Sequence, residues 1–94
     1  AAARPDAFLP DLAMSLNNLG AMLSDLGRRE EALAAAEEGV AITLPLARKY
    51  SRTSGAMLRS LCDNVEATLA ALGRAPESSG SLVRARALLK ELDA

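Results

Sequence analysis

Apolar residues recur at three- and four-residue steps in four stretches of the chain, a spacing that predicts four amphipathic helices. In the first stretch the predicted buried face consists of Leu9, Leu12, Leu16, Leu19 and Leu23. The expected helices run over residues 8–26, from 28 or 29 to an interruption near 44, over 54–72, and from 76 to about 93. Strands are not expected, because the pattern has no alternation of period two.

Two glycines mark the expected ends of the first and third helices. Both stand in the same context, Leu26-Gly27-Arg28 and Leu72-Gly73-Arg74, where a left-handed residue commonly closes a helix. The two glycines are 46 residues apart, and a shift of that length aligns the two halves of the sequence without a gap. Helix–turn–helix units repeated at such a period indicate a helical solenoid.

Prolines and small polar residues are expected to interrupt these helices. A turn is expected at Pro5, and Pro10 suits the first turn of a helix, where its missing amide has no intrahelical partner. Pro45 predicts a kink or an end around residues 41–44, followed by an irregular linker to Ser54. Pro76 is expected to start the last helix, which Gly80 would weaken.

The stretch Leu16–Ala36, LNNLGAMLSDLGRREEALAAA, resembles a tetratricopeptide repeat of the longer variety found in kinesin light chain and bacterial regulatory proteins. The signature places of that repeat fall on Leu16, Leu19, Gly20, Leu23, Ala32, Ala36, Gly39 and Leu44. Leu19, Gly20, Ala32 and Gly39 match in kind, whereas Leu16, Leu23 and Ala36 fill places that are aromatic in the family. In the second half Glu66 stands at the place of Gly20 and Cys62 at that of Leu16. The second repeat is therefore degenerate.

The resemblance implies an all-α fold in which two antiparallel helical hairpins stack as a segment of a right-handed α-solenoid. We expect a single domain over residues 1–94, with one hairpin over 8–50 and a degenerate hairpin over 54–93. The pattern alone is also compatible with generic amphipathic hairpins in an up-down bundle. Because the chain begins without Met, we expect it to be part of a longer protein, and the resemblance implies that this protein is a regulatory one.

Composition narrows the classes of partner and location. Half of the residues are apolar and very few are aromatic, so the core must consist of Leu, Ala, Met, Val and Ile. A net charge of −1 makes nucleic acid and anionic membranes poor partners. We expect no membrane-spanning or signal segment, because no apolar run is long enough. A lone cysteine, Cys62, fits a reducing, cytoplasmic location.

Catalysis is not expected, because the chain contains no histidine and so lacks the commonest general base and zinc ligand. Cys62 falls on the inward face of its helix and predicts a buried apolar role. The adjacent acids of Glu30-Glu31 and Glu37-Glu38 point apart on a helix, and Arg84, Arg86 and Lys90 predict a solvated face. No metal or cofactor is expected.

The resemblance implies a protein or peptide partner, bound on the concave surface formed by the first helix of each hairpin. The residues that would face this partner are Met14, Asn17, Asn18, Ala21, Asp25, Ser60, Asp63, Asn64 and Ala67. Asn18 and Asn64 are the most informative, since a side-chain amide can both donate to and accept from a peptide backbone. They could equally be partly exposed polar residues or make contacts between hairpins. Because these faces lack Lys and Arg, an acidic C-terminal tail is a poor ligand.

Self-association is the alternative function. Two hairpins cannot cover both outer faces of a solenoid. The last expected helix is apolar on more than one side, through Leu82, Val83, Leu88, Leu89 and Leu92. An exposed patch of this kind would pack on a further repeat or on a second copy of the chain, in a two-fold homo-oligomer.

Overall fold

The computed structural model describes residues 5–93, apart from the side chains of residues 5–7 and 53. Within them are four α-helices and no strand, which confirms the predicted all-α fold. The helices are α1 (Pro5–Asp25), α2 (Arg29–Lys49), α3 (Ser51–Ala71) and α4 (Gly80–Asp93), with a short 3-10 helix η1 (Pro76–Ser78) before α4. None of them is long and apolar enough to cross a membrane.

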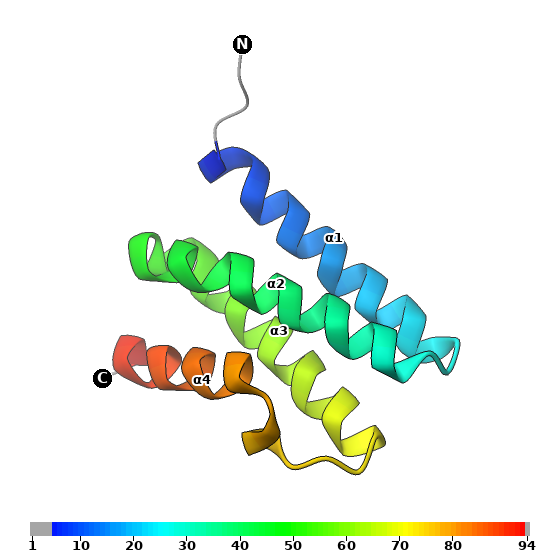
Figure 1. The fold of residues 1–94 in the computed structure, drawn as a ribbon. Coiled ribbons are helices and arrows are strands. Elements are labelled where there is room, and N and C mark those ends of the chain that lie inside the picture. The colour runs from blue at the N-terminus through cyan, green and yellow to red at the C-terminus, as the bar shows by residue number, and fades with distance from the viewer. Residues whose placement is uncertain (1–4, 94) are drawn as a thin grey trace.

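The helices form two stacked hairpins (Figure 1). α1 and α2 make the first hairpin and α3 and α4 the second, and α2 packs against all three other helices. α1 and α3 run in the same direction and also contact each other. Their carboxyl ends therefore lie at the same side of the molecule, next to the two glycine turns.

The predicted glycine ends are confirmed at both hairpins. Gly27 and Gly73 have φ values of +78° and +71°, the left-handed region that favours glycine. The same pair of backbone hydrogen bonds closes both helices: Arg28 N–H to Leu23 C=O (2.9 Å), Gly27 N–H to Ser24 C=O (3.0 Å), Arg74 N–H to Leu69 C=O (2.8 Å) and Gly73 N–H to Ala70 C=O (3.1 Å). This is the Schellman arrangement, repeated after 46 residues.

The prolines interrupt the helices less than expected. Pro5 is the first residue of α1, three residues before the predicted start, and Pro10 lies inside the helix rather than in its first turn. The predicted end of the helix around residues 41–44 is wrong, since α2 continues through Pro45 to Lys49. Because Pro45 has no N–H, the Ala41 carbonyl lacks its usual hydrogen-bond donor. Both residues are exposed, so water can donate to that carbonyl instead.

The predicted irregular linker before Ser54 is also wrong, because Tyr50 alone separates α2 from α3. The Tyr50 N–H donates to the Leu46 carbonyl at 2.7 Å, and the Tyr50 carbonyl accepts from the Ser54 N–H at 2.9 Å. Ser54 and Gly55 are buried in the first turns of α3. Apart from Tyr50, the residues expected in this linker therefore belong to α2 and α3.

Helix α4 begins later than predicted. Pro76 starts the separate turn η1, and Gly80 opens α4 instead of weakening its interior. Ser79 caps the helix: its Oγ accepts from the Leu82 N–H at 3.3 Å, and it donates to Glu37 Oε2 of α2 at 2.6 Å. One serine thus ends the loop and ties the second hairpin to the first.

The core is centred on α3, where Leu58, Leu61 and Val65 are fully buried between the other helices. The predicted buried face of α1 is only half-buried, and Leu19 is wrong outright, with 45% of its surface exposed. The fully covered positions of α1 are the small residues Ala13 and Gly20, because the helix approaches α2 closely and has neighbours on one side only.

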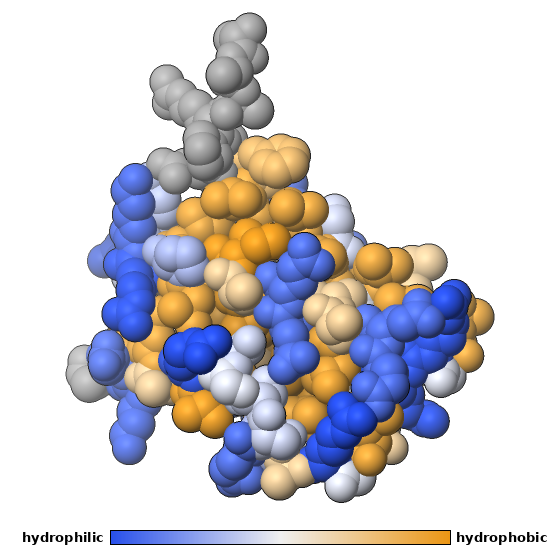
Figure 2. Space-filling model, in the orientation of Figure 1, coloured by the Kyte–Doolittle hydropathy of each residue, from blue (hydrophilic) through white to orange (hydrophobic). Residues whose placement is uncertain are grey.

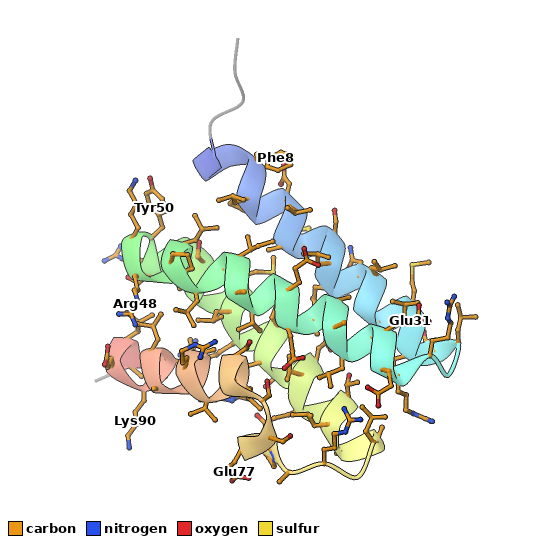
Figure 3. The ribbon with its side chains drawn as sticks, in the orientation of Figure 1. Phe8, Glu31, Arg48, Tyr50, Glu77 and Lys90 are labelled. Atoms are coloured by element: carbon orange, nitrogen blue, oxygen red, sulfur yellow. The ribbon has the colours of Figure 1, made fainter. Side chains whose placement is uncertain are left out.

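The predicted apolar patch on the last helix is wrong at three of its five positions. Leu82, Leu88 and Leu89 are buried within the chain itself, because α4 packs on both α3 and α2. Val83 and Leu92 remain on the surface. Around them the exposed side chains of α4 and its neighbours are charged or polar, as the outward-pointing Lys90 and Glu77 in Figure 3 illustrate.

Three glycines offer a test of the helix ends. Gly27→Ala and Gly73→Ala should each lower the free energy of unfolding by about 1 kcal/mol, because an L-residue is strained at positive φ. Neither site has an atom within 4 Å of the added Cβ, so the effect would be one of backbone conformation alone. Gly55→Ala is the control, because an added Cβ there also has no atom within 4 Å but the glycine lies within α3 and has no positive φ. This substitution should raise the free energy of unfolding by up to about 1 kcal/mol. Equal effects at all three sites in urea unfolding would contradict this explanation.

Cys62 offers a second test, through pH. Burial raises the pKa of its thiol to about 11, so the thiolate is scarce in the folded chain near neutral pH. Iodoacetamide at pH 8 should alkylate the folded protein roughly a hundredfold more slowly than the chain unfolded in guanidinium. The neutral thiol's contribution to stability should hold below the unfolded pKa of 9.0 and decline as the pH rises towards 11. The Cys62→Ala variant should lack that part of the decline, and similar alkylation rates for the folded and unfolded chains would refute the assignment.

Candidate functional site

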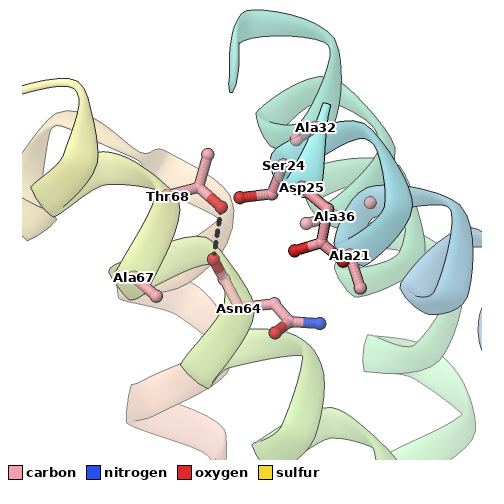
Figure 4. A pocket seen from close by; sticks show the side chains of 9 residues that line it. Ala21, Ser24, Asp25, Ala32, Ala36, Asn64, Ala67 and Thr68 are labelled. Atoms are coloured by element: carbon pink, nitrogen blue, oxygen red, sulfur yellow. Dashed lines mark hydrogen bonds between the residues drawn. The ribbon is translucent and has the colours of Figure 1, made fainter. Parts of the chain in front are cut away.

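A cleft opens between the carboxyl-terminal halves of α1 and α3, and we call it the interhelix cleft (Figure 4). Its volume is about 210 Å³. It is lined by Gly20, Ala21, Ser24 and Asp25 of α1, Asn64, Ala67 and Thr68 of α3, and Ala32 and Ala36 of α2. Three helices from both hairpins thus contribute to one site.

Small residues create this space. Gly20 approaches α2 so closely that a Cβ there would lie 3.4 Å from the Ala32 carbonyl oxygen and 3.9 Å from the Ala36 Cβ. Alanines at 21 and 67 on the two walls add only methyl groups. With no long side chain to bridge α1 and α3, the cleft stays open.

Polar groups face one another across the interhelix cleft. Ser24 and Asp25 reach in from α1, while Asn64 and Thr68 come from α3 (Figure 4). The Thr68 hydroxyl donates to the Asn64 carbonyl at 2.7 Å, which leaves its oxygen lone pairs available as acceptors. No hydrogen bond or ion pair within residues 5–93 engages the Asp25 carboxylate. The cleft therefore presents mostly acceptors and one uncompensated negative charge.

The structure brings about half of the predicted partner-binding residues together. Ala21, Asp25, Asn64 and Ala67 line the interhelix cleft, and Asn17 reaches it through a hydrogen bond from Asn64 Nδ2 to Asn17 Oδ1. The two equivalent asparagines differ in their surroundings, because Asn64 lines the cleft whereas Asn18 is exposed and does not. The residue beside it in sequence makes the contact between hairpins. Partner binding by any of these residues remains a prediction.

The remaining predicted residues lie elsewhere on the two helices. Met14 lines a second cleft of about 180 Å³ towards the amino end of α1, together with the buried Thr43, whose Oγ1 has no hydrogen-bond partner within the described chain. Ser60 is exposed. Asp63 is turned towards α4, where it accepts a hydrogen bond from Arg86 at 3.0 Å.

Sequence reasoning missed five residues of the interhelix cleft. Ser24 and Thr68 could have been found, since each lies one helical turn beyond a predicted site residue, Ala21 and Asn64 respectively. Gly20, Ala32 and Ala36 were recognised only as packing places. Their contribution to the cleft depends on how far apart α1 and α3 stand.

Arginines pair with acids across both hairpins. Arg86 lies on the helix face predicted to be solvated, and it bonds there to Asp63 and Glu66 of α3. Glu66 occupies the place equivalent to Gly20, so charged side chains fill the second hairpin where the first has a close helix contact. The other pairs are Arg28 with Glu31, Arg74 with Glu30, and Arg59 with Asp93. Exposed pairs of this kind contribute little, about 0–1 kcal/mol each.

No catalytic arrangement emerges among the described side chains. They include no group of three potential metal ligands, and Glu30 and Glu31 are each engaged by a different arginine. The one thiol, Cys62, is buried with a raised pKa. A thiol in such surroundings is a poor nucleophile.

Comparison with known proteins agrees with the first repeat. The family model of the tetratricopeptide repeat matches residues 12–44, about a third of the chain. That segment contains most of α1 and the larger part of α2, including Gly20 and Gly39 at their packing places. No curated protein and no solved structure matches the chain. Residues 12–44 are thus similar to a tetratricopeptide repeat, a family of helical hairpins associated with protein–protein interaction.

Proposed function

We propose that this chain is a non-catalytic interaction module that binds an extended peptide segment of a protein partner on the surface shared by α1 and α3. The interhelix cleft is the observation that carries the proposal, because it is formed by both hairpins and lies on that surface. Similarity of residues 12–44 to a tetratricopeptide repeat supports a protein partner. We further propose that the module works in the cytoplasm, as part of a regulatory protein of the kinesin-light-chain-like variety.

A peptide suits this surface for two physical reasons. Its backbone needs donors and acceptors, which Asn64, Ser24 and Thr68 supply at the interhelix cleft. Its side chains need pockets, and this surface offers the interhelix cleft and the second cleft near Met14. Both helices present their surfaces in parallel, so one extended segment could reach both clefts.

We also propose that residues 8–50 and 54–93 are two degenerate copies of one hairpin within a single domain. The support is the recurrence of the same glycine turn and the same pair of backbone hydrogen bonds after 46 residues. The copies differ at Glu66, which replaces the close-packed Gly20.

Filling the cleft should abolish peptide binding. Peptides selected from a random library against the wild-type chain should bind the Ala67→Leu variant about tenfold more weakly, because the larger side chain occupies the interhelix cleft. The measurement is fluorescence anisotropy with labelled peptides. Ala34→Leu, the same change on an exposed face of α2, should leave affinity unchanged. If Ala67→Leu binds every selected peptide as well as wild type, the proposed site is wrong.

A specific observation also favours the second candidate function, self-association, but through α1 rather than α4. One side of α1, continued by the residue after it, carries a line of residues that is apolar except for Ser15. We call this line the outer stripe: Phe8, Leu12, Ser15, Leu19, Met22 and Leu26. These residues follow one another at alternating steps of four and three, which places them on one side of a helix. Met22 and Leu26 are 62% and 71% exposed, and apolar residues gather near the start of α1 in Figure 2.

The proposed 46-residue repeat gives this stripe a counterpart in α3. A shift of 46 residues carries the outer stripe onto Ser54, Leu58, Leu61, Val65, Thr68 and Leu72 of α3. In α3 these residues are buried or partly buried against the first hairpin. The outer stripe of α1 is therefore the counterpart of an established helix interface, left uncovered within the described chain.

A second copy would cover this stripe best in an antiparallel, two-fold pairing of α1 with its counterpart. Such a pairing sets Phe8 opposite Leu26 and Leu12 opposite Met22, so apolar residues meet apolar residues. Head-to-tail stacking is less favourable. The open side of the second hairpin bears the ion pairs of Arg86 and Arg59, and an apolar stripe would desolvate them.

The mass of the chain in solution tests self-association, the second candidate function. Light scattering of the wild-type chain should show a mass that rises with concentration towards a dimer, while Met22→Glu should remain a monomer at the same helical content. A glutamate at this exposed position leaves the monomer's core untouched but buries a charge in the dimer. The control Ala87→Glu on α4 should dimerise like wild type. A wild-type chain that stays monomeric at every concentration would rule the dimer out.

A further inference from the structure

We propose that the interhelix cleft binds a cation, the side chain of a lysine or arginine in the peptide. This inference rests on the proposed function and adds the chemical class of the residue recognised. It is carried by the charge and hydrogen-bonding character of the lining groups together with the shape of the site.

The first observation is the Asp25 carboxylate. Asp25 lies at the rim of the interhelix cleft, and within the described chain no arginine, lysine or hydrogen-bond donor engages it. Nearby polar atoms, Ser24 Oγ, Thr68 Oγ1 and the Asn64 amide oxygen, can all accept hydrogen bonds. An ammonium or guanidinium group carries several N–H donors and a positive charge, and it complements this set.

The second observation is the position of two helix ends. α1 ends at Asp25 and α3 at Ala71, and both helices point their carboxyl ends towards the side of the molecule where the interhelix cleft opens. The carboxyl end of a helix carries roughly half a negative charge. Neither helix has a basic residue in its last turn to offset it. Asp25 itself lies at a helix carboxyl end, where a negative charge is unfavourable. A bound cation would offset both the charge of Asp25 and the partial negative charges of the two helix ends.

The third observation explains why Arg28 and Arg74 do not supply the cation for the interhelix cleft. Arg28 and Arg74 directly follow the two glycine turns, but each is held by an acid of α2. Arg28 donates to Glu31 through Nε at 3.0 Å and Nη2 at 2.7 Å, and Arg74 donates to both carboxylate oxygens of Glu30. Each of these two arginines is therefore paired with a glutamate of α2 and not with Asp25.

The shape of the site suits a long cationic side chain. Ala32 and Ala36 of α2 contribute apolar methyl groups to its lining, and Ala21 and Ala67 line its walls. The methylene chain of a lysine or arginine can pack on these methyl groups while its charged end stays at the polar rim. A volume of about 210 Å³ gives room for one such side chain.

The test compares three peptides that differ at one position. Acetyl-GAXAG-amide, with X as lysine, norleucine or glutamate, is titrated into the ¹⁵N-labelled full chain, and amide shifts are followed by NMR. The lysine peptide should shift the amides of Ser24, Asp25, Asn64, Ala67 and Thr68. The norleucine peptide, of similar length but uncharged, should bind about three- to fivefold more weakly, the effect of one partly exposed charge pair. The glutamate peptide should give no saturable shifts.

Asp25→Asn separates charge from shape. This variant should lose the preference for lysine over norleucine while binding norleucine as before. Glu38→Gln, which removes one carboxylate charge at an exposed position of α2, should keep the preference. Raised salt should weaken the lysine peptide only.

Two results would overturn the proposal. Equal affinities for lysine and norleucine at the cleft amides would reject the cation while supporting peptide binding. No cleft shift with any of the three peptides would also reject it, and the library selection with Ala67→Leu would then decide the proposed function separately.

Discussion

The close packing of helix backbones at small residues is the constraint on which the rest of this structure depends. At Gly20 a Cβ would lie 3.4 Å from the Ala32 carbonyl oxygen, and at Gly39 it would lie 2.7 Å from Leu61 Cδ2. α2 can therefore contact both α1 and α3, which also contact each other. Since helix stability in proteins derives largely from such packing, the long helices persist despite Pro10 and Pro45.

That same constraint shapes the candidate site. Because α1 and α3 are both held against α2, their carboxyl-terminal halves stand side by side with alanines between them, and the interhelix cleft remains. The site is negative because of what surrounds it: Asp25, two helix carboxyl ends, and arginines already bound by Glu30 and Glu31. Packing thus determines its shape, and the pairing of charges elsewhere determines its preference for a cation.

The two ends of the molecule differ for a related reason. The second hairpin replaces Gly20 by Glu66 and covers its open side with ion pairs, whereas the first hairpin leaves the apolar outer stripe of α1 exposed. The outer stripe of α1 is exposed while the residues 46 positions later in α3 are buried or partly buried, and this difference indicates a direction for association. It also explains why predicting self-association from the apolar content of α4 selected leucines that the chain buries itself.

The sequence by itself determined the helices, the all-α class, the glycine turns and the burial of Cys62, because these follow from local spacing and backbone preference. The resemblance of the sequence to a tetratricopeptide repeat also predicted a shared surface for Ala21, Asp25, Asn64 and Ala67, which line one cleft. Only the tertiary structure decided that Asn17 rather than Asn18 meets Asn64, that Arg86 is paired, that α2 continues through Pro45, and that Leu19 is exposed while Leu89 is buried. Each of these depends on which neighbouring helix covers a residue and at what distance, and no pattern within a single helix contains that information.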